Sequence, residues 1–398
     1  MTPLHLSHFT ASSCLGCGLD ETLTALRRQR GGLAPCRFET VLDLDTYIGE
    51  VSAVDAHPLP AALAEYECRN NRLALLGLQQ DGFAAAVQAA IARYGRRRVG
   101  VFLGTSTAGI LQTEQAYRRR DQDTGALPDD FIYRTTHNTY SVAGFVRDWF
   151  HLEGPAVVVS TACSSSAKVF ASAARLLAAG VIDAAIVGGV DSLCLTTLYG
   201  FNSLELLSPE PCRPFDVDRK GLSIGEAAAF GLLERPSESL DADAVLLLGA
   251  GESSDAYHMS APHPDGLGAR MAMAAALESA GLQAADIGYI NLHGTATPSN
   301  DAAEGKAVFA LFGDRTPCSS VKGATGHTLG AAGGLEAVVS ALALRHAFLP
   351  GGINTVHLDP GIPIQYLTAN REFAPHRVMS NSFGFGGTNC SLVLGRAG

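Results

Sequence analysis

The chain has 398 residues, with 39 acidic and 29 basic side chains and a formal net charge of −10 at pH 7. A chain of this length can bury a large core, either as one fold or as two closely packed halves. Its acidic balance argues against a nucleic-acid-binding protein, which would need a broadly basic surface. The apolar runs are too short to span a bilayer, and residues 1–10 lack the pattern of a signal peptide, so we expect a soluble, cytoplasmic protein.

The nine cysteines are scattered from Cys14 to Cys390. An odd number in a chain of this size does not indicate a disulfide framework, which is typical of small secreted domains. Cys14 and Cys17 form one C-x-x-C pair, which is the spacing of a redox pair or of half a zinc site. Because the sequence has no second such pair, we interpret it as a chance spacing, and we predict no metal site.

In chain order, short apolar runs alternate with alanine-rich stretches of helical length. The apolar runs are typical of strands buried on both faces. They cover residues 99–103, 156–160, 184–187 and 244–248. Two of the alanine-rich stretches, 167–179 and 335–347, predict helices. The alternation predicts an α/β fold around a largely parallel central sheet.

The two halves of the chain repeat one another weakly. In residues 1–240 a strand ends at Cys163, just before a helix of small residues. In residues 241–398 a segment reaches His327, just before a Gly- and Ala-rich helix. The polar stretch 235–243 separates the halves. We therefore predict two domains, 1–240 and 241–398, that are copies of one α/β unit with strand-end loops facing each other.

Cys163 lies where the predicted strand meets the predicted helix, in the sequence VVVSTACSSSA. The unpaired N–H groups and the dipole at a helix N-terminus favour a thiolate over a thiol. The alternative is a buried structural cysteine, but such a residue would more naturally lie among Leu and Val than among small polar residues. We predict that Cys163 is a nucleophile that carries an acyl group as a thioester.

His293 follows a strand predicted over residues 287–292 and begins a loop of small residues, HGTATPSN. An isolated histidine is usually surface or core filler, but this loop is typical of an active site at a strand end. The hydroxyl groups of Thr295 and Thr297 in the same loop could hydrogen-bond an extended, amide-bearing substrate arm.

Two further loops are rich in glycine. Lys322 and His327 lie five residues apart in VKGATGHTLGAAGGLE, which lacks the pattern of a phosphate-binding loop. So many glycines cost backbone entropy on folding, and close approach of a ligand or of another backbone would explain them. The segment NSFGFGGTN at 381–389 could aim backbone N–H groups inward, although an ordinary glycine hairpin is the alternative.

Taken in order, these four segments resemble the elongating β-ketoacyl-acyl-carrier-protein synthases of the thiolase superfamily. The resemblance covers nearly the whole chain and includes the sequence CRPFDVDRKGLSIGEAAA at residues 212–229. It implies a thiolase-like fold, in which two duplicated α/β halves form a five-layered α-β-α-β-α core. It also implies an acyltransferase that condenses an enzyme-bound acyl thioester with malonyl-acyl-carrier-protein by decarboxylative Claisen chemistry. Fatty acid, polyketide and aryl-polyene biosynthesis are all possible settings.

The resemblance also implies residue roles. Cys163 would be the acylated nucleophile, Lys322 would organise the site electrostatically, and His293 and His327 would stabilise an enolate. The backbone N–H groups of Cys163 and Phe385 would form an oxyanion hole, and Phe385 would gate the acyl pocket. Three carboxylates would support the site without contacting the substrate: Glu304, Glu336 and Asp301. Thr295 and Thr297 would contact the phosphopantetheine arm of the substrate.

The family needs no metal or redox cofactor, but some members hold a structural monovalent cation at the positions of Asn291, Glu336 and Ser382. The expected partner is an acyl carrier protein, which is acidic, so docking on this acidic enzyme requires a local basic patch. The candidate docking residues are Arg69, Arg72, Arg119 and Arg120. We expect a dimer, either of two identical chains or with a related subunit.

Other activities remain as alternatives. A thiolase acting on CoA thioesters would need a Cys-x-Gly-x-Gly loop, whereas residues 384–387 read GFGG and Cys390 lies beyond them. Priming synthases and chalcone-type enzymes use Cys, His and Asn. A chain-length-factor-like subunit would lack the active cysteine. Ala227 replaces the glycine usual after Glu226, and the N-terminal segment matches only loosely, so pathway, acyl chain length and dimer type stay open.

Overall fold

The computed structural model describes residues 1–39 and 43–398. In this part of the chain, eleven strands join in one sheet, in the order β12-β11-β15-β16-β10-β1-β9-β7-β5-β6, with β2 paired to β1. These strands are β1 (Leu4–Ser13), β2 (Gly16–Cys17), β5 (Val99–Gly104), β6 (Ala156–Val159), β7 (Ala184–Asp191), β9 (Ala227–Glu234), β10 (Val245–Ser254), β11 (Tyr289–Asn291), β12 (Cys318–Ser319), β15 (Arg377–Phe383) and β16 (Thr388–Arg396).

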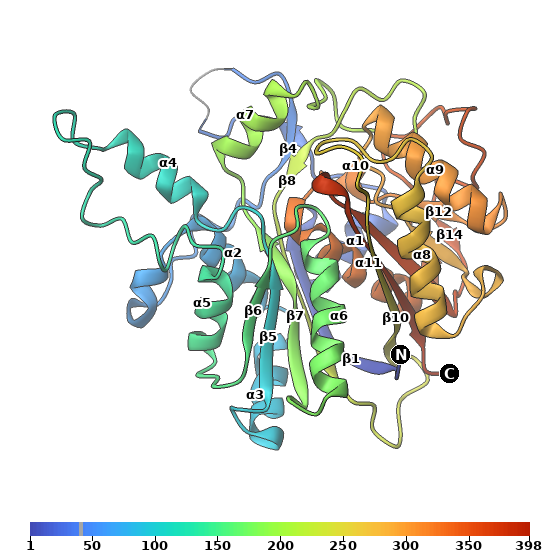
Figure 1. The fold of residues 1–398 in the computed structure, drawn as a ribbon, viewed down its shortest axis with the longest axis horizontal. Coiled ribbons are helices and arrows are strands. Elements are labelled where there is room, and N and C mark those ends of the chain that lie inside the picture. Colours follow the sequence, from blue (N-terminus) through green and yellow to red (C-terminus); the bar gives the residue numbers. More distant parts are fainter. Residues whose placement is uncertain (40–42) are drawn as a thin grey trace.

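Helices surround and separate the strands (Figure 1). The α-helices are α1 (Leu19–Arg27), α2 (Arg69–Leu78), α3 (Phe83–Tyr94), α4 (Ile110–Arg118), α5 (Ser141–Trp149), α6 (Ser165–Ala178), α7 (Leu195–Ser203), α8 (Leu267–Ala280), α9 (Pro298–Phe312), α10 (Lys322–Thr325) and α11 (Ala332–His346). The 3-10 turns are η1 (Ala61–Tyr66), η2 (Ala284–Asp286), η3 (Leu329–Ala331) and η4 (Phe385–Gly387). Two small sheets contain β3 (Ala34–Pro35), β4 (Tyr47–Gly49), β8 (Ile224–Gly225), β13 (Phe348–Leu349) and β14 (Arg371–Glu372).

The large sheet consists of two sets of strands with the same pattern. In the first set β6, β5 and β7 are parallel, and β9 and β1 follow antiparallel. In the second set β12, β11 and β15 are parallel, and β16 and β10 follow antiparallel. The sets meet where β1 pairs with β10, at Leu4 with Leu247 and at His5 with Leu246. This repetition of order and direction is the duplication predicted from the sequence, and residue 240 lies in the connection between the two sets.

The strands and helices form five layers. The middle layer is α6 and α11, which pack against each other and contact strands of both sets. The outer layers are α2, α3 and α5 on the first set and α8 on the second. Figure 1 shows these layers from left to right as α5, the strands β6, β5 and β7, then α6, β10 and α8. The thiolase-like arrangement predicted for the fold is therefore present.

The glycines of the middle layer allow its close packing. A Cβ atom at Gly333 of α11 would lie 2.7 Å from the Cβ of Ala167 in α6, and one at Gly189 of β7 would lie 2.5 Å from the Cβ of Ser166. Real Cβ atoms do not approach this closely, so only glycine fits at either position. The close backbone approach expected for the glycine-rich segment around His327 is confirmed.

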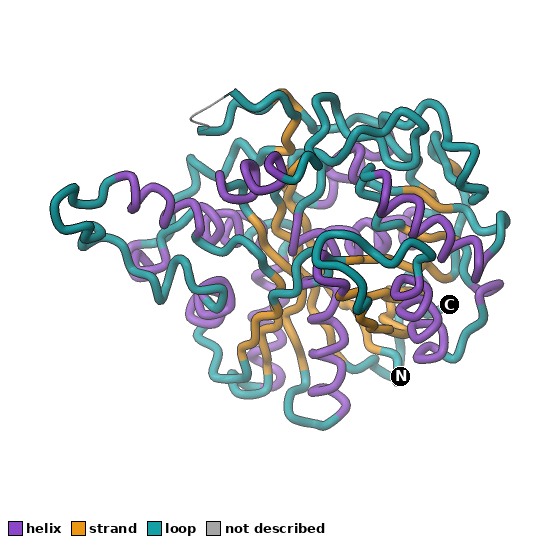
Figure 2. Tube along the Cα trace, turned by 45° about the horizontal axis from the view of Figure 1, so that its top comes forward, coloured by secondary structure: helices purple, strands orange, loops and turns teal. Residues whose placement is uncertain are grey.

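The sheet differs from the prediction in strand direction. Six of its strand pairings are antiparallel and four are parallel, so "largely parallel" is wrong. β9 is buried on both faces along its whole length, as β7 is, and a doubly buried strand gives the same apolar pattern although β9 pairs antiparallel with both of its neighbours. Helix α4 and the loop after it project away from the rest of the molecule (Figure 2). None of the described helices is long and apolar enough to cross a membrane.

Candidate active site

Cys163 lies in a tight turn between β6 and α6, two residues before the helix begins. Ala162 has a left-handed backbone conformation, with φ of +52°, which turns the chain sharply before the cysteine. Ser165 holds this turn: its hydroxyl accepts a hydrogen bond from the Thr161 N–H at 2.8 Å and donates one to the Ala162 carbonyl at 2.6 Å. The predicted placement of Cys163 at a helix N-terminus is confirmed.

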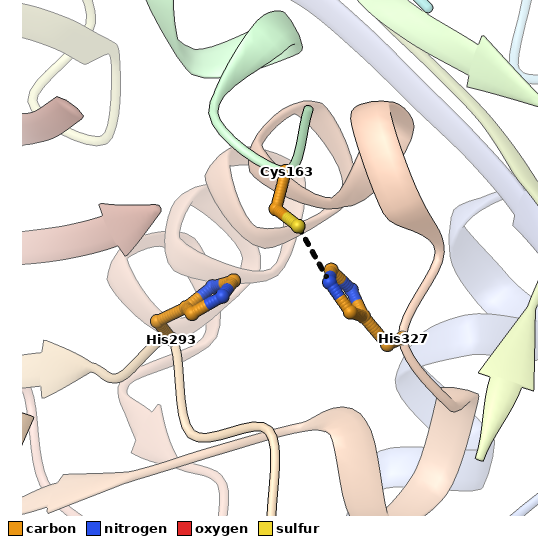
Figure 3. Close-up of side chains that lie close together, drawn as sticks. All are labelled: Cys163, His293 and His327. Atoms are coloured by element: carbon orange, nitrogen blue, oxygen red, sulfur yellow. Dashed lines mark hydrogen bonds between the residues drawn. The ribbon is translucent and has the colours of Figure 1, made fainter. Parts of the chain in front are cut away.

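Three side chains from the two halves of the chain meet at this turn (Figure 3). The Cys163 sulfur lies 2.9 Å from Nε2 of His327. The rings of His293 and His327 are 5.3 Å apart between centroids and nearly perpendicular, at 85°. All three side chains are buried, with at most 6% exposure. Each of the three was predicted separately from the sequence, and the structure brings them together.

Burial decides the protonation of the sulfur. It raises the pKa of the Cys163 thiol to about 11, and the backbone N–H of Phe385 and the charge of Lys322 offset the effect only in part. The resting side chain is therefore a thiol at neutral pH, and the thiolate predicted from the helix N-terminus alone is wrong. Desolvation of the sulfur is the largest cause of this shift, and it favours the neutral thiol.

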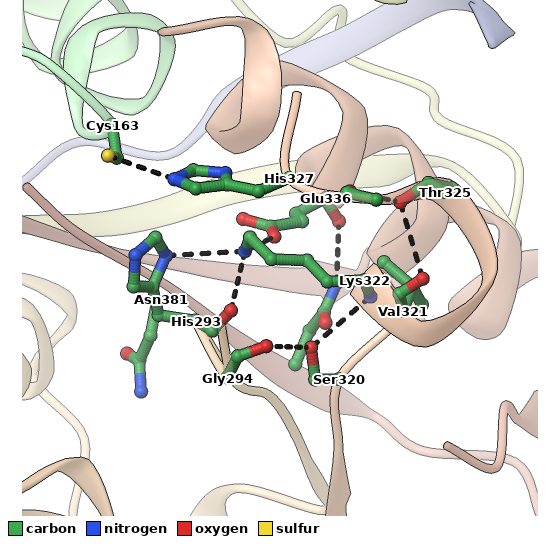
Figure 4. Close-up of polar contacts among 12 residues, drawn as sticks. Cys163, His293, Gly294, Ser320, Val321, Lys322, Thr325, His327, Glu336 and Asn381 are labelled. Carbon is green, nitrogen blue, oxygen red and sulfur yellow. Dashed lines mark hydrogen bonds and ion pairs between the residues drawn. The ribbon is translucent and has the colours of Figure 1, made fainter. Parts of the chain in front are cut away.

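Lys322 lies behind His293, with 1% of its side chain exposed. Its ammonium group donates to the His293 carbonyl at 2.5 Å, approaches the Nδ1 atom of the same histidine at 3.3 Å and forms an ion pair with Glu336 (Figure 4). An ammonium group has only donors, so Nδ1 must accept, and the ring proton of neutral His293 is then on Nε2. His293 is thereby held as an Nε2–H donor.

Both histidines are neutral at physiological pH. The pKa of His293 is well below its usual range because the ring is buried, and the positive charge of Lys322 and the nearby His327 lower it further. The pKa of His327 is also well below its usual range, first through burial and then through Lys322. A neutral ring can donate an N–H hydrogen bond to an anionic oxygen directly, whereas a protonated ring would first have to lose a proton to reach this neutral state.

The donor atoms of Cys163, His293 and His327 lie within 4.8 Å of one another, a spacing that also occurs in metal sites. A metal ligand must present a lone pair, however. The contact from Lys322 to Nδ1 puts a proton on Nε2 of His293, so this ring is set to donate a hydrogen bond and not to bind a metal.

Two buried carboxylates hold the loop that follows His293. Glu304 accepts the N–H groups of His293 at 2.8 Å and Gly294 at 2.7 Å, and Asp301 accepts those of Phe215 at 2.8 Å and Ala296 at 3.2 Å. Burial raises the pKa of Glu304 to about 7, although both N–H groups oppose that rise. These carboxylates and Glu336, paired with Lys322, lie where a supporting role was predicted.

A pocket leads to the sulfur between the two glycine-rich loops. Its lining includes Cys163, His293, His327, Thr295, Thr297, Phe201, Phe383 and Phe385. The hydroxyl groups of Thr295 and Thr297 are 2.9 Å apart, and the ring of Phe385 packs on that of Phe201 at 5.6 Å. Phe201 was not predicted from the sequence, because a single aromatic residue in a helix has no distinguishing pattern.

The candidate docking arginines differ in their environments. Arg69 is 5% exposed and pairs with the buried Glu226 at 2.6 Å and with Asp55 at 2.7 Å, so its prediction as a docking residue is wrong. It lies at the start of α2, on the side that faces the core. The other three are wholly or partly accessible: Arg72 pairs with Glu67, Arg119 pairs with Asp130, and Arg120 bonds the carbonyl of Tyr117.

Comparison with known proteins agrees with this geometry. Residues 72–239 match the family model described as beta-ketoacyl synthase, N-terminal domain, and residues 244–356 match the C-terminal domain. A 3-oxoacyl-(acyl-carrier-protein) synthase 2 from Rhizobium meliloti is 40% identical over 318 residues, covering 75% of this chain and 74% of that protein. One from Vibrio cholerae is 34% identical over 340 residues, covering 80% and 82%.

Solved structures give the same answer over the full length. A ketosynthase (ApeO) in complex with its chain length factor (ApeC) from Xenorhabdus doucetiae has a TM-score of 0.90 and 39% identity, covering 100% of this chain and 98% of that chain. A beta-ketoacyl synthase from Burkholderia phymatum has a TM-score of 0.88 and 28% identity, with complete coverage of both chains. The chain therefore belongs to the beta-ketoacyl synthase family and is an elongating-type ketosynthase.

Proposed function

We propose that this enzyme condenses an acyl group held on Cys163 with malonyl-acyl-carrier-protein and releases CO2. The observation that carries the proposal is the meeting of one thiol and two neutral histidines in a buried pocket, with Lys322 behind them. The relatives named as 3-oxoacyl-acyl-carrier-protein synthases are acyltransferases, which supports the same reaction class.

The first step loads the enzyme. The Cys163 sulfur attacks the carbonyl carbon of an acyl thioester as its proton passes to Nε2 of His327, 2.9 Å away. The bond to the carrier sulfur breaks, and that sulfur leaves as a thiol with the proton. The backbone N–H groups of Cys163 and Phe385 stabilise the oxyanion, and the Phe385 N–H already reaches the cysteine sulfur.

The second step makes the carbon nucleophile. Malonyl thioester loses CO2, and the electron pair of the broken bond moves to the thioester oxygen as an enolate. Both histidines line the pocket, and His293 is held as an Nε2–H donor that can stabilise this oxygen. One such donor is worth roughly 3 kcal/mol of transition-state stabilisation in other enzymes. Neutral histidines fit this step, since they stabilise the enolate without protonating the carbon.

The third step joins the two carbons. The enolate carbon attacks the carbonyl of the acyl group on Cys163, and the same oxyanion hole receives the developing charge. Collapse of the tetrahedral intermediate breaks the bond to sulfur, and the released Cys163 thiolate takes up a proton from solvent, because its own proton left with the carrier thiol in the first step. Because the pKa of the thiol is about 11, the released sulfur is protonated at neutral pH, which returns the enzyme to its resting form.

We propose Asn291, Glu336 and Ser382 as holders of a monovalent cation, and their environment fits one. Within the described residues, Oδ1 of Asn291 is buried and accepts no hydrogen bond, and Ser382 lies beside the Glu336 carboxylate. A bound cation would offset the negative charge of Glu336. Replacing K+ in the buffer by a large organic cation should lower the melting temperature of the wild-type enzyme. The same replacement should leave the melting temperature of the Asn291→Ala variant unchanged.

The partners are proposed on the same basis. An acyl carrier protein supplies both substrates, with the phosphopantetheine arm passing Thr295 and Thr297. The structural neighbour from Xenorhabdus doucetiae is a ketosynthase in complex with a chain length factor, so a heterodimer with a related subunit is the assembly that the comparisons support. A polyketide or aryl-polyene pathway is a second setting beside fatty acid synthesis. The presence of Cys163 argues against a role as the chain length factor itself.

Incubation with acyl- and malonyl-loaded carrier protein tests the function. We expect a 3-oxoacyl product and an acyl adduct on Cys163 by mass spectrometry. Cys163→Ala should remove both, and Cys68→Ala, which changes another buried cysteine, should keep both. Condensation by Cys163→Ala would disprove the proposal. Acyl donors of graded length and unsaturation, tested with and without a partner subunit, would then define the substrate.

A further inference from the structure

Asp191 is a buried carboxylate near the active site that the reaction above does not use. It is the last residue of β7, and its side chain is fully buried. Six donor groups point at its two oxygens. They are the hydroxyl groups of Thr105, Ser106 and Thr107 and the backbone N–H groups of Ser106, Thr107 and Gly330, at 2.5 to 3.1 Å.

These donors come from both halves of the fold. Residues 105–107 follow β5 in the first half, beside the end of β7. Gly330 lies three residues after His327 in the second half. Its N–H donates to Oδ2 of Asp191 at 2.5 Å and also reaches the Ser106 hydroxyl at 3.2 Å. The carboxylate thus ties a strand-end loop of one half to the histidine loop of the other.

The loop after His327 needs such a tie. Leu329 has a φ of +52°, a strained conformation for a leucine, and a Cβ at Gly330 would lie 2.7 Å from Oδ2 of Asp191. On the other side of the histidine, the His327 N–H donates to the Ser223 carbonyl at 2.7 Å. The His327 carbonyl accepts the Gly225 N–H at 2.9 Å, so residues 223 and 225 hold the residue itself, and Asp191 holds the strained loop that follows it.

We propose that Asp191 is a positioning residue for His327, acting through Gly330 to keep Nε2 in line with the Cys163 sulfur; this rests on the proposed function. The carboxylate suits the task because all six groups around it donate, and a carboxylate only accepts. An amide in its place would present an NH2 group to some of these donors. The donor that faces the amide nitrogen, on Ser106, Thr107 or Gly330, would lose its hydrogen bond.

The test is the rate of malonyl-carrier-protein decarboxylation in six matched enzymes: wild type, His327→Ala and His293→Ala, each with and without Asp191→Asn. Asp191→Asn should lower kcat by about 10- to 100-fold, because a misplacement of about 1 Å has costs of that order, and should change KM less. In a His327→Ala background the same substitution should change the rate less than about twofold. In a His293→Ala background the full loss should persist. Equal losses in all backgrounds would mean a general structural role and would overturn the proposal.

Two further variants guard against a failure to fold. Ser106→Ala removes one hydroxyl from the network and should give a smaller loss of the same kind. Asp81→Asn is the control, since Asp81 also accepts a threonine hydroxyl and a backbone N–H, but between β1 and α1, away from the pocket. It should keep the wild-type rate. Wild-type activity in both Asp191→Asn and Ser106→Ala would refute the inference.

The activity of the wild-type enzyme distinguishes an error about Asp191 from an error about the reaction. If the wild-type enzyme does not decarboxylate malonyl-carrier-protein, the function is wrong. If the wild type is active and Asp191→Asn is equally active, only the role of Asp191 is wrong. The rate of iodoacetamide reaction at Cys163 gives a second readout, because a displaced His327 no longer accepts the thiol proton.

Discussion

The buried pair of Lys322 and Glu336 leads to a prediction in which stability and catalysis separate. Both side chains are at most 2% exposed. Lys322→Met removes the ammonium group and leaves Glu336 buried without its partner. Breaking a buried pair in this way costs about 3–5 kcal/mol of unfolding free energy. Lys322 lowers the pKa of Glu336, which is about 7 with the lysine present, so removing it raises that pKa further.

The pH dependence of this loss follows from the sign of the shift. Above pH 7 the carboxyl group must either remain charged without a partner or take up a proton, and both are costly. At pH 6 it is already largely neutral, so Lys322→Met should destabilise the protein less at pH 6 than at pH 8. Lys322→Met with Glu336→Gln removes both charges and should recover most of the stability, because a neutral pair has no unpaired charge.

Catalysis should not recover in the double variant. Without Lys322 no other described residue donates to Nδ1 of His293, so Nε2 loses its fixed proton and one donor to the enolate is weakened. Loss of one such donor lowers the rate by about 10²- to 10³-fold in other enzymes. The assays are urea unfolding at pH 6 and pH 8 and release of CO2 from malonyl-carrier-protein.

Lys306→Met is the matched control. Lys306 is 56% exposed and pairs with Asp265 at 3.2 Å, so its loss should cost less than about 1 kcal/mol and leave the rate unchanged. If Lys322→Met were as stable as Lys306→Met, the buried pair would not carry the stability assigned to it. If the double variant decarboxylated at the wild-type rate, the assignment of the His293 proton would be wrong.

Three further predictions concern single residues. Burial raises the pKa of Glu304 to about 7, so the contribution of this carboxyl group to the free energy of unfolding falls as pH rises from about 4.5 to 7. Glu304→Gln should flatten that part of a plot of unfolding free energy against pH. An unchanged slope would contradict this prediction. Gly333→Ala should destabilise the protein by about 1–3 kcal/mol in urea unfolding, since the new Cβ atom would meet Ala167. The control is Gly200→Ala on α7, where the new Cβ atom has open space, and it should be neutral or stabilising. Alkylation of Cys163 should accelerate with pH through pH 7 to 9 because its pKa is about 11; a rate that levels off below pH 8 would show a thiolate at rest.

The parts of the site that were predicted from the sequence depend on local patterns. Cys163 was found because a strand runs directly into a helix around it, and that junction is present between β6 and α6. The helices predicted over 167–179 and 335–347 are α6 and α11, within a few residues at each end. Glycine-rich loops are visible in a sequence because the backbone conformation they permit is a property of the residue itself.

Other features depend on packing between distant segments, and the sequence predicted them wrongly or not at all. Arg69 reads as a surface arginine on a helix, but its partner Glu226 is 157 positions away. The thiol of Cys163 was expected to ionise, and burial by both halves of the fold prevents it. Asp191 ends an apolar strand, and nothing near it in the chain indicates that Gly330 will donate to it.

The sequence by itself determined the reaction class through the resemblance of its motifs to a known family, and it predicted Cys163 as the nucleophile and a duplicated α/β architecture from residue types at short spacing and from one repeated order of elements. Tertiary structure alone decided the charge state of the site. Desolvation and the distances between Lys322, His293 and Cys163 set the protonation of the histidines and the sulfur, and these quantities exist only after the two halves have packed together.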